Sequence, residues 1–391
     1  MPSLQPAVDL KVQSKIVGPG MLALMVGAWL STEFGRQHAT LFLVGALLGV
    51  TLYHAAFGFT SAYRRMFVQR DVTAVRPQLL MLAAATVLFA PVLSDGTAFG
   101  HPVVGAVAPL GIQVAVGAFI FGLGMQLGGG CGSGTLFMVG GGSARMVLTL
   151  IAFCAGSFVA SLHMQWWIVT PRLPAIALSD TFGWSAAVAL QLILLFVLSE
   201  LLRRWGAKNI AYPDIRGFTW HKLTRGPWPY VWGGLALAAL NWVTLVVSGH
   251  PWTITWAFTL WGAKAAQLLG WNPGGVWFWS GGFTENALNS SIWADETSIM
   301  DIGILIGAFI AAGAAGRFAP TLRIPLRSII AAVLGGLLMG YGARIAFGCN
   351  IGAFFSGVAS TSLHGWLWII CALSGTWIGV KLRPWFGLAN E

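Results

Sequence analysis

Charge is scarce in this chain. Only 9% of its 391 residues are Asp, Glu, Lys or Arg, whereas 57% are hydrophobic. A soluble domain carries roughly 25% charged residues, so this chain has too few to cover a surface that faces water. Long stretches without charge, among them 41–59, 103–126 and 182–199, fill much of the sequence. A spanning helix needs about 20 apolar residues, and by that length we predict an all-α polytopic membrane protein with roughly nine to eleven spans across the lipid bilayer.

Negative charge is the scarcer sign, because 12 acidic residues stand against 22 basic ones and the net charge is +10. Most acids, as with Asp95, Asp180 and Asp301, are expected in alternate loops. Basic residues gather between the other apolar segments, mainly at 64–76, 203–225 and 317–327. The alternation follows the positive-inside rule and points to no nucleic-acid partner. It predicts that both termini and the 203–227 loop are cytoplasmic.

The motifs of several enzyme classes are missing. The sequence has no nucleotide-binding loop, no metalloprotease motif and no serine-triad signature, so ATP-driven and hydrolytic chemistry are disfavoured and we expect no enzyme. A cleavable signal peptide is missing as well, because Lys11 and Lys15 precede the first apolar run without a small-residue cleavage site. We expect that run to anchor the chain.

Cysteine is nearly absent, with four residues in the whole chain. No C-x2-C pair occurs, and no histidine lies next to Cys131 or Cys349. Zinc and other soft-ligand metals need two or more clustered ligands of these kinds, so we expect neither a metal site nor another cofactor. A disulfide is equally unexpected inside a membrane.

Glycine, by contrast, is abundant and marks an internal repeat. The string "GLGMQLGGGCGSGTLF" at 122–137 returns as "GYGARIAFGCNIGAFF" at 340–355. The most polar internal segment lies between the copies, so we predict an N-terminal half-repeat 1–202, a connecting loop 203–227 and a C-terminal half-repeat 228–391. An offset of 218 residues superimposes Gly117, Gly122, Gly124, Gly130, Cys131, Gly134 and Phe137 on Gly335, Gly340, Gly342, Gly348, Cys349, Gly352 and Phe355.

The loop charges give the two copies opposite directions through the membrane. The segment that leads to Cys131 starts outside, whereas the one that leads to Cys349 starts at the basic 317–327 cluster. This predicts an inverted-repeat helical transporter fold with a substrate site near the midplane. The Gly- and Pro-broken stretch 263–293 fits such a fold as two short broken or re-entrant helices.

The Gly-Cys strings predict a break in each helix. Five glycines and a serine around Cys131 will hardly hold a regular helix. Irregular backbone at membrane depth must be buried in protein or line a polar cavity. Its unpaired N–H groups, with the N-terminus of a following half-helix, form a natural seat for an anion. For Gly117, Gly122 and Gly124, upstream of the break, we predict a role in close helix packing.

The thiols divide into two pairs by context. Cys154 and Cys371 lie in plain apolar runs, where a buried cysteine packs as a small inert hydrophobe. Inert packing remains an alternative for Cys131 and Cys349, but their strings favour contact with a soft, sulfur-bearing solute. The S–H group is a weak donor suited to a diffuse sulfur acceptor, and an apolar setting favours the neutral thiol, which does not repel an anion.

Four segments carry a family resemblance: "FGFTSAYRRMF" (57–67), "GGGCGSG" (128–134), "GARIAFGCNIGAFFSGV" (342–358) and "SLHGW" (362–366). With them the sequence resembles the YeeE/YedE family of membrane proteins, which includes thiosulfate importers and members linked to selenium metabolism. The resemblance implies an hourglass-like inverted-repeat fold in the bacterial inner membrane, with Cys131 and Cys349 lining the path of the sulfur compound. It also implies a cytoplasmic sulfur-transfer protein as a partner. Relatives often read C-F-T-S-A where this chain has Gly58, so a third path thiol is missing here.

These observations predict an inner-membrane importer of a small sulfur-containing anion, with thiosulfate as the leading substrate. The alternatives are a transporter of a selenium compound or another sulfur species, and a membrane redox or sulfur-carrier protein that uses a cysteine persulfide. For Arg344, Lys264, Glu285 and His54 a structural role is at least as plausible as a functional one. The candidate substrate-binding residues are Cys131, Cys349, Gly130, Gly132, Ser133, Gly134, Gly348, Asn350, Gly352, Thr60 and Ser61.

Overall fold

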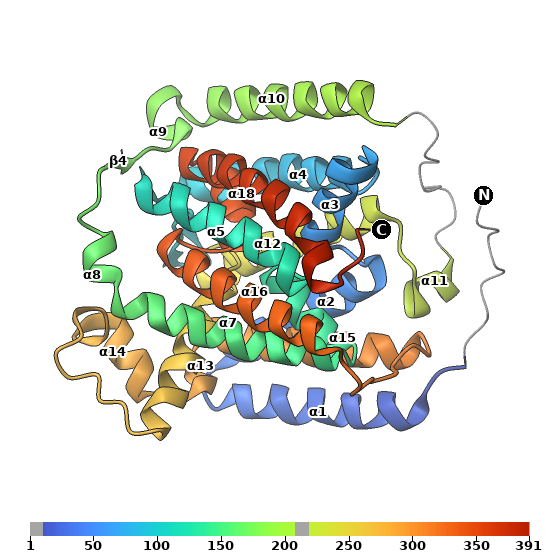
Figure 1. The fold of residues 1–391 in the computed structure, drawn as a ribbon. Helices are drawn as coiled ribbons and strands as arrows, with labels where there is room; N and C mark the ends of the chain where they lie inside the picture. The colour runs from blue at the N-terminus through green and yellow to red at the C-terminus, as the bar shows by residue number, and fades with distance from the viewer. Residues whose placement is uncertain (1–10, 208–218, 391) are drawn as a thin grey trace.

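The computed structural model describes residues 11–207 and 219–390, and most of this part of the chain is helical (Figure 1). Two small antiparallel ribbons pair β1 (Thr97–Ala98) with β2 (His101–Pro102) and β3 (Pro109–Gly111) with β4 (Arg172–Ala175). The helices are α1 (Ser14–Thr32), α2 (Arg36–Ala55), α3 (Phe59–Gln69), α4 (Val75–Asp95), α5 (Ile112–Gly128), α6 (Gly132–Gly140), α7 (Ala144–Leu162), α8 (Met164–Trp167), α9 (Leu178–Phe182), α10 (Trp184–Trp205), α11 (Trp220–Arg225), α12 (Tyr230–Ser248), α13 (Thr255–Leu268), η1 (Trp277–Trp279), α14 (Gly282–Asn289), η2 (Ile292–Ala294), α15 (Glu296–Ala314), α16 (Leu326–Ile345), η3 (Asn350–Phe355), α17 (Ser356–Ala359), α18 (Leu363–Leu382) and η4 (Arg383–Phe386).

Ten segments of the described chain are long and apolar enough to cross a membrane. This confirms the all-α polytopic membrane protein and falls within the expected number of spans. Local sequence sets several helix ends. Asp295 caps α15 by accepting a hydrogen bond from the Ser298 N–H at 2.8 Å, and Gly249 ends α12 in the left-handed conformation with φ of +79°.

The long helices run roughly parallel, so the molecule has two end faces (Figure 1). One end, here named the basic face, holds the start of α1, the end of α10, α11 and the end of α18. The other end, the opposite face, holds β4, α8, α9 and α14. The described parts of the basic clusters, 64–76, 203–207, 219–225 and 317–327, lie at the basic face, so the two faces differ in charge as the sequence predicted. The assignment of the basic face to the cytoplasm stays a prediction.

The two Gly-Cys copies meet along α5 and α16. A Cβ atom on Gly117 would lie 2.6 Å from the carbonyl oxygen of Gly342, and one on Gly124 would lie 2.8 Å from that of Gly335. The repeat offset relates Gly117 to Gly335 and Gly124 to Gly342, so each contact is the symmetry copy of the other. The helices therefore cross antiparallel about a pseudo-two-fold axis, and only glycine permits this close an approach. The predicted packing role of Gly117 and Gly124 is borne out.

The same symmetry arranges the neighbouring helices. Gly122 of α5 packs directly on the backbone of Ala372 in α18, and Gly340 of α16 packs on the backbone of Phe153 in α7. At the periphery α1 packs against α15 and α10 packs against α4, and these outer helices lie on opposite sides of the bundle (Figure 1). The buried core between them includes both motif cysteines. The division into halves at 203–227 remains a prediction.

Candidate functional site

Each Gly-Cys string breaks its helix at the same place. Just past the end of α5, Gly129 has φ of +92°, and just past the end of α16, Phe347 has φ of +62°. The repeat offset relates these two residues, so the left-handed turn is conserved between the copies although one of them is not glycine. Such a conformation is unfavourable for an aromatic residue. After this turn, a new short helix begins on the far side of each cysteine.

The cysteines occupy the cap positions of those short helices. Cys131 precedes α6 and Cys349 precedes η3, a single π-helical turn that continues into α17. The Cys131 carbonyl accepts from the Thr135 N–H at 2.8 Å, and the Cys349 carbonyl accepts from the Ala353 N–H at 3.0 Å. These two bonds are again related by the repeat offset. Both cysteine backbones are extended, which is the usual cap conformation.

The sulfur atoms point at the first turn of each short helix. The Cys349 Sγ accepts from the Ile351 N–H at 3.5 Å, and the Cys131 Sγ lies 3.5 Å from the Ser133 Oγ. The N–H groups of Gly134 and Gly352 also point at Cys131 and Cys349, respectively. The Cys349 thiol thus takes the place of a serine or aspartate oxygen in an ordinary cap, whereas the Cys131 side chain makes no cap hydrogen bond.

The two thiols are close neighbours. A Cβ atom on Gly132 would lie only 3.0 Å from the Cys349 Sγ, so the glycine after one cysteine makes room for the other sulfur. Both cysteines are 0% exposed. Burial without a cationic partner favours the neutral thiol. The site therefore offers two S–H groups side by side in the interior.

Two more short helices begin at the same point. The first is α3, whose Phe59 N–H points at the Cys131 sulfur. The second is α13, which is preceded by Thr253 and Ile254. A Cβ atom on Gly352 would lie 3.1 Å from the Thr253 Oγ1, and one on Gly132 would lie 3.5 Å from the Ile254 Cγ2. Segment 252–255 was not among the predicted site residues. Gly249 and Pro251, just before it, mark a break in the chain ahead of a short helix.

Four helix N-termini thus converge on the thiols, those of α3, α6, α13 and η3. The first N–H groups of a helix have no partner within the helix. Each N-terminus carries about half a positive elementary charge. Four such N-termini close together favour an anion without any basic side chain.

Aromatic rings pack against one another beside the thiols. The rings of Phe59 and Phe354 meet edge to face at 6.5 Å, and Phe354 stacks with Trp368 at 6.5 Å. The Trp368 Nε1 also donates to the Gly348 carbonyl at 3.2 Å, which fixes the turn before Cys349. An apolar wall strengthens electrostatic contacts inside the site because it lowers the local dielectric constant.

Some buried polar atoms at the site have spare hydrogen-bonding capacity. Within the described chain, neither side-chain amide atom of Asn350 makes a hydrogen bond of good geometry. The same is true of the Thr60 hydroxyl. Asn350 is 0% exposed, and the buried Tyr63 side chain lies close enough to interact with it and with Cys131. Buried polar groups are nearly always paired, so unpaired ones in a candidate site point to a ligand.

The other predicted site residues play different parts. A Cβ atom on Gly130 would lie 3.1 Å from the Thr135 nitrogen, and one on Gly348 would lie 2.8 Å from the Ala353 nitrogen. These glycines therefore shape the turns before the cysteines. The Ser61 hydroxyl is turned to its own helix start, where it donates to the Gly58 carbonyl at 3.4 Å.

Lys264 and Arg344 have structural partners. The Lys264 Nζ donates to the carbonyl oxygens of Leu288 and Ser290 at 2.7 and 2.6 Å, and so closes the end of α14. The Arg344 guanidinium lies over the Phe278 ring at 5.2 Å. Both lie toward the opposite face.

Glu285 and His54 also have structural surroundings. Glu285 is exposed and accepts from the Gly281 N–H at 2.6 Å. His54 is buried and packs against the Trp228 ring at 5.7 Å. The structural interpretation of these residues therefore accounts for their positions.

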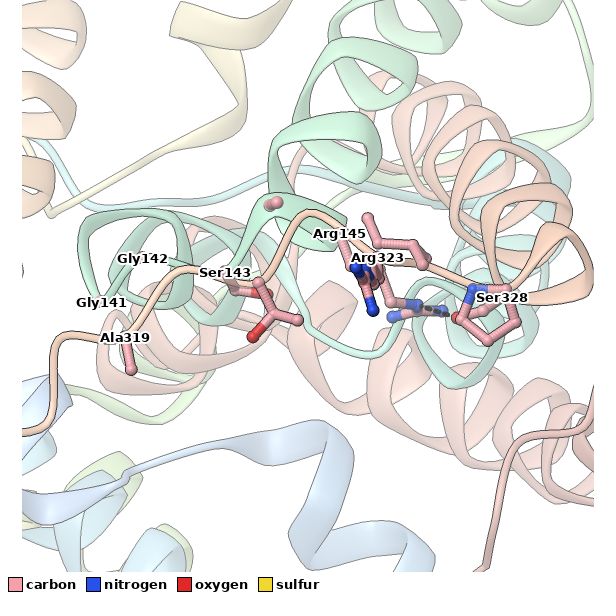
Figure 2. A pocket seen from close by; sticks show the side chains of 11 residues that line it. Gly141, Gly142, Ser143, Arg145, Ala319, Arg323 and Ser328 are labelled. Atoms are coloured by element: carbon pink, nitrogen blue, oxygen red, sulfur yellow. Dashed lines mark hydrogen bonds between the residues drawn. The ribbon is translucent and has the colours of Figure 1, made fainter.

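A cavity of about 400 Å³ opens at the basic face, between the start of α7 and the segment before α16 (Figure 2). Arg145 and Arg323 line it together with Ser143 and Ser328, and neither motif cysteine does. Arg145 links the cavity to the Gly-Cys string. Its Nε donates to the Ser328 Oγ at 2.8 Å, and its Nη1 donates to the Gly128 carbonyl at 2.6 Å.

Comparison with known proteins finds a matching family and several similar transporters. A family described as sulphur transport matches residues 54–378. The thiosulfate transporter TsuA of Spirochaeta thermophila is 29% identical over 359 residues, which cover 86% of this chain and 96% of that protein. The thiosulfate transporter TsuA of Escherichia coli is 27% identical over 361 residues, or 88% and 94% of the two chains. The probable transporter YedE of Escherichia coli is 33% identical over 156 residues, or 39% and 37% of the two chains.

Proposed function

The chain belongs to the sulphur-transport family, and on that premise we propose that it imports thiosulfate through the site between Cys131 and Cys349. It is a membrane transporter of a sulfur compound and not an enzyme. The relatives named as thiosulfate transporters align with most of the chain, which favours thiosulfate over a selenium compound.

The observation that carries this proposal is the convergence of four helix N-termini on two neighbouring buried thiols. Thiosulfate is a dianion with one terminal sulfur and three oxygens. Four N-termini of about half a charge each come to about two positive charges, which matches the dianion. Backbone N–H groups bind the oxygens, and the S–H groups of Cys131 and Cys349 donate to the terminal sulfur. No bond of the substrate changes.

The path in this proposal runs from the opposite face to the basic face. From Cys349, η3 and α17 lead to Thr361, whose carbonyl accepts from the Leu178 N–H of the opposite-face loop at 2.9 Å. From Cys131, α6 leads to Gly141 and the cavity of the basic face. An anion that is imported along this line meets the thiol of Cys349 first and that of Cys131 second. A cytoplasmic sulfur-transfer protein would then receive it at the basic face.

Growth on thiosulfate tests the function. A strain without sulfate and thiosulfate importers should grow on thiosulfate as sole sulfur source only when it carries this gene. The same strain with the gene should still fail on sulfate, which controls for general leakage. Equal growth on thiosulfate with and without the gene, at confirmed expression, would overturn the proposal.

A further inference from the structure

Asp301 is an acidic side chain in the second turn of α15, a helix long and apolar enough to span a membrane. It is 0% exposed, and neither carboxylate oxygen has a hydrogen-bond partner within the described chain. An ionisable side chain buried within a membrane-spanning helix costs free energy and is usually functional. Unlike most buried acids, it has no basic side chain or N–H group to balance it.

The other buried acids show what an ordinary structural role looks like. Asp71 accepts from the Thr73 hydroxyl at 2.6 Å and lies 3.5 Å from an Arg65 guanidinium nitrogen. Asp295 accepts from the Trp256 Nε1 at 2.8 Å and caps its own helix. Asp301 has neither kind of contact, so a structural role does not account for it.

Asp301 faces the thiol site. On the same side of α15, three residues earlier, Ser298 accepts from the Trp261 Nε1 of α13 at 3.0 Å. Seven residues later, the Ala308 Cβ would lie 2.8 Å from a Cβ atom on Gly140 of α6. Positions at these spacings share one helix face, so Asp301 points between α13 and α6, two of the helices that begin at the thiols.

The titratable groups around Asp301 are few. Within the described residues, it interacts electrostatically with Cys349 at the start of η3, with Cys154 of α7 and with Asp295 of its own helix. None of these supplies a positive charge. An uncompensated buried carboxylate must therefore bind a proton or gain a cation from outside the chain.

We propose that Asp301 is the proton-binding site through which this transporter couples anion import to a proton gradient; this rests on the proposed thiosulfate import. The carboxylate binds a proton that arrives from the opposite face and releases it at the basic face in the same cycle. The proton moves between water and one Asp301 oxygen, and the substrate is neither oxidised nor reduced. Each proton offsets one of the two negative charges of thiosulfate, which the inside-negative membrane potential opposes.

Reconstituted protein gives the test. Proteoliposomes with wild-type protein should accumulate radiolabelled thiosulfate at least 10-fold more when the outside is acidic than without a pH gradient. Asp301→Asn should lose this stimulation but keep exchange of labelled for unlabelled thiosulfate, because exchange needs no net proton movement. Asp95→Asn, an exposed acid at the end of α4, is the matched control and should behave like wild type.

A proton measurement keeps the test decisive if Asp301→Asn does not fold. With wild-type protein and a pH dye inside the vesicles, addition of thiosulfate outside should acidify the lumen, whereas chloride should not. Thiosulfate exchange without acidification would overturn the role of Asp301 and leave the proposed substrate intact. Stimulation of Asp301→Asn by the gradient to the wild-type level would also overturn that role. Absence of exchange in the wild type would overturn both proposals.

Discussion

At the scale of single residues, the thiols and the glycines beside them divide the work. The cysteines offer S–H donors and cap the short helices, while the adjacent glycines remove side-chain bulk where backbone and sulfur come close. The clearest case is Gly132, whose missing side chain leaves room for the sulfur of Cys349. The cysteines therefore supply the hydrogen-bond donors, and the glycines of the same string leave room for the close contacts.

The thiol contact predicts an asymmetry among the cysteines. Cys131→Ala and Cys349→Ala should each lower thiosulfate uptake at least 10-fold at unchanged protein level, because a single-file path cannot bypass a lost contact. Cys371→Ala should transport nearly normally, since Cys371 is only partly buried in α18 and the change costs about 1 kcal/mol. Uptake of radiolabelled thiosulfate into cells measures all three.

Serine at the two sites separates hydrogen bonding from covalent chemistry. Cys131→Ser and Cys349→Ser should retain more uptake than the alanine variants, because O–H still donates. If serine and alanine are equally inactive, a persulfide carrier becomes the better account. Wild-type uptake by both alanine variants would rule out any role of the thiols.

The motif glycines predict a graded response. Gly348 has φ of +145°, and a Cβ atom there would lie 2.8 Å from the Ala353 nitrogen, so Gly348→Ala should cost about 1–3 kcal/mol and most of the uptake. Gly130→Ala meets backbone at 3.1 Å and should be milder. Gly18→Ala has no neighbour within 4 Å and is the control. Uptake and thermal stability should follow this order; equal behaviour of all three variants would contradict it.

At the scale of elements, short helices form the candidate site, and arginine side chains bind the end of the long helix that leads to it. Two arginines hold the carbonyl end of α5: the Arg145 Nη2 donates to Leu127 and the Arg383 Nη1 donates to Gln126, both at 2.6 Å. Cations at a helix C-terminus balance its negative end. The backbone before Cys131 is thereby fixed although its sequence is rich in glycine.

A second link joins elements at the opposite face. The His250 Nε2, just after α12, lies 3.3 Å from the Glu296 Oε2 at the start of α15. Burial lowers the pKa of His250, but Glu296 and the Pro251 carbonyl outweigh it, so the pKa is raised above its ordinary value. With a raised folded-state pKa, the pair stabilises the protein fully below about pH 6.5, and this stabilisation is lost as the pH rises through the folded-state pKa.

The pH dependence of His250→Gln tests this link. The purified variant should melt at a lower temperature than wild type at pH 6, and the difference should shrink as the pH rises to 8.5, because the wild-type histidine loses its proton as the pH passes its raised pKa. Thermal unfolding in detergent at both pH values measures it. A gap of the same size at both pH values would show that the substitution acts through packing alone.

At the scale of the whole molecule, charge and symmetry set the orientation. The two repeats cross antiparallel at α5 and α16, yet the basic segments gather at one face, because the inverted copies differ in their loops. The pseudo-two-fold relation places the two cysteine strings next to each other. The charge difference between the faces predicts which face is cytoplasmic.

Surface labelling tests that orientation. A single cysteine in place of Thr224 of α11 should react with an impermeant thiol reagent in inverted vesicles and not in intact spheroplasts. A cysteine in place of Asp180 of α9 should give the reverse pattern. Two of the native thiols are buried and two are partly buried, so the protein without the added cysteine measures the background in both preparations. Labelling of the Thr224 variant in intact spheroplasts would place the basic face outside.

By itself the sequence determined the membrane class, the number of spans, the repeat and the two cysteines. These features depend on composition, on the length of apolar runs and on one repeat offset, which are local or periodic properties. The packing role of Gly117 and Gly124 was also readable, because small residues in apolar helices allow close contact. The resemblance also pointed to the segment at Gly58, and the backbone of the next residue, Phe59, interacts with the Cys131 thiol.

Only the tertiary structure decided which distant residues share the site. Segment 252–255 lies about 120 residues from Cys131 and carries no glycine-cysteine signal, so its contact with Gly132 and Gly352 depends on how the inverted halves interlock. The sequence likewise groups Asp301 with the acids of the alternate loops, whereas the structure places it, buried, in α15. A helix face and the meeting of four N-termini are set by packing between elements, and no local pattern encodes that packing.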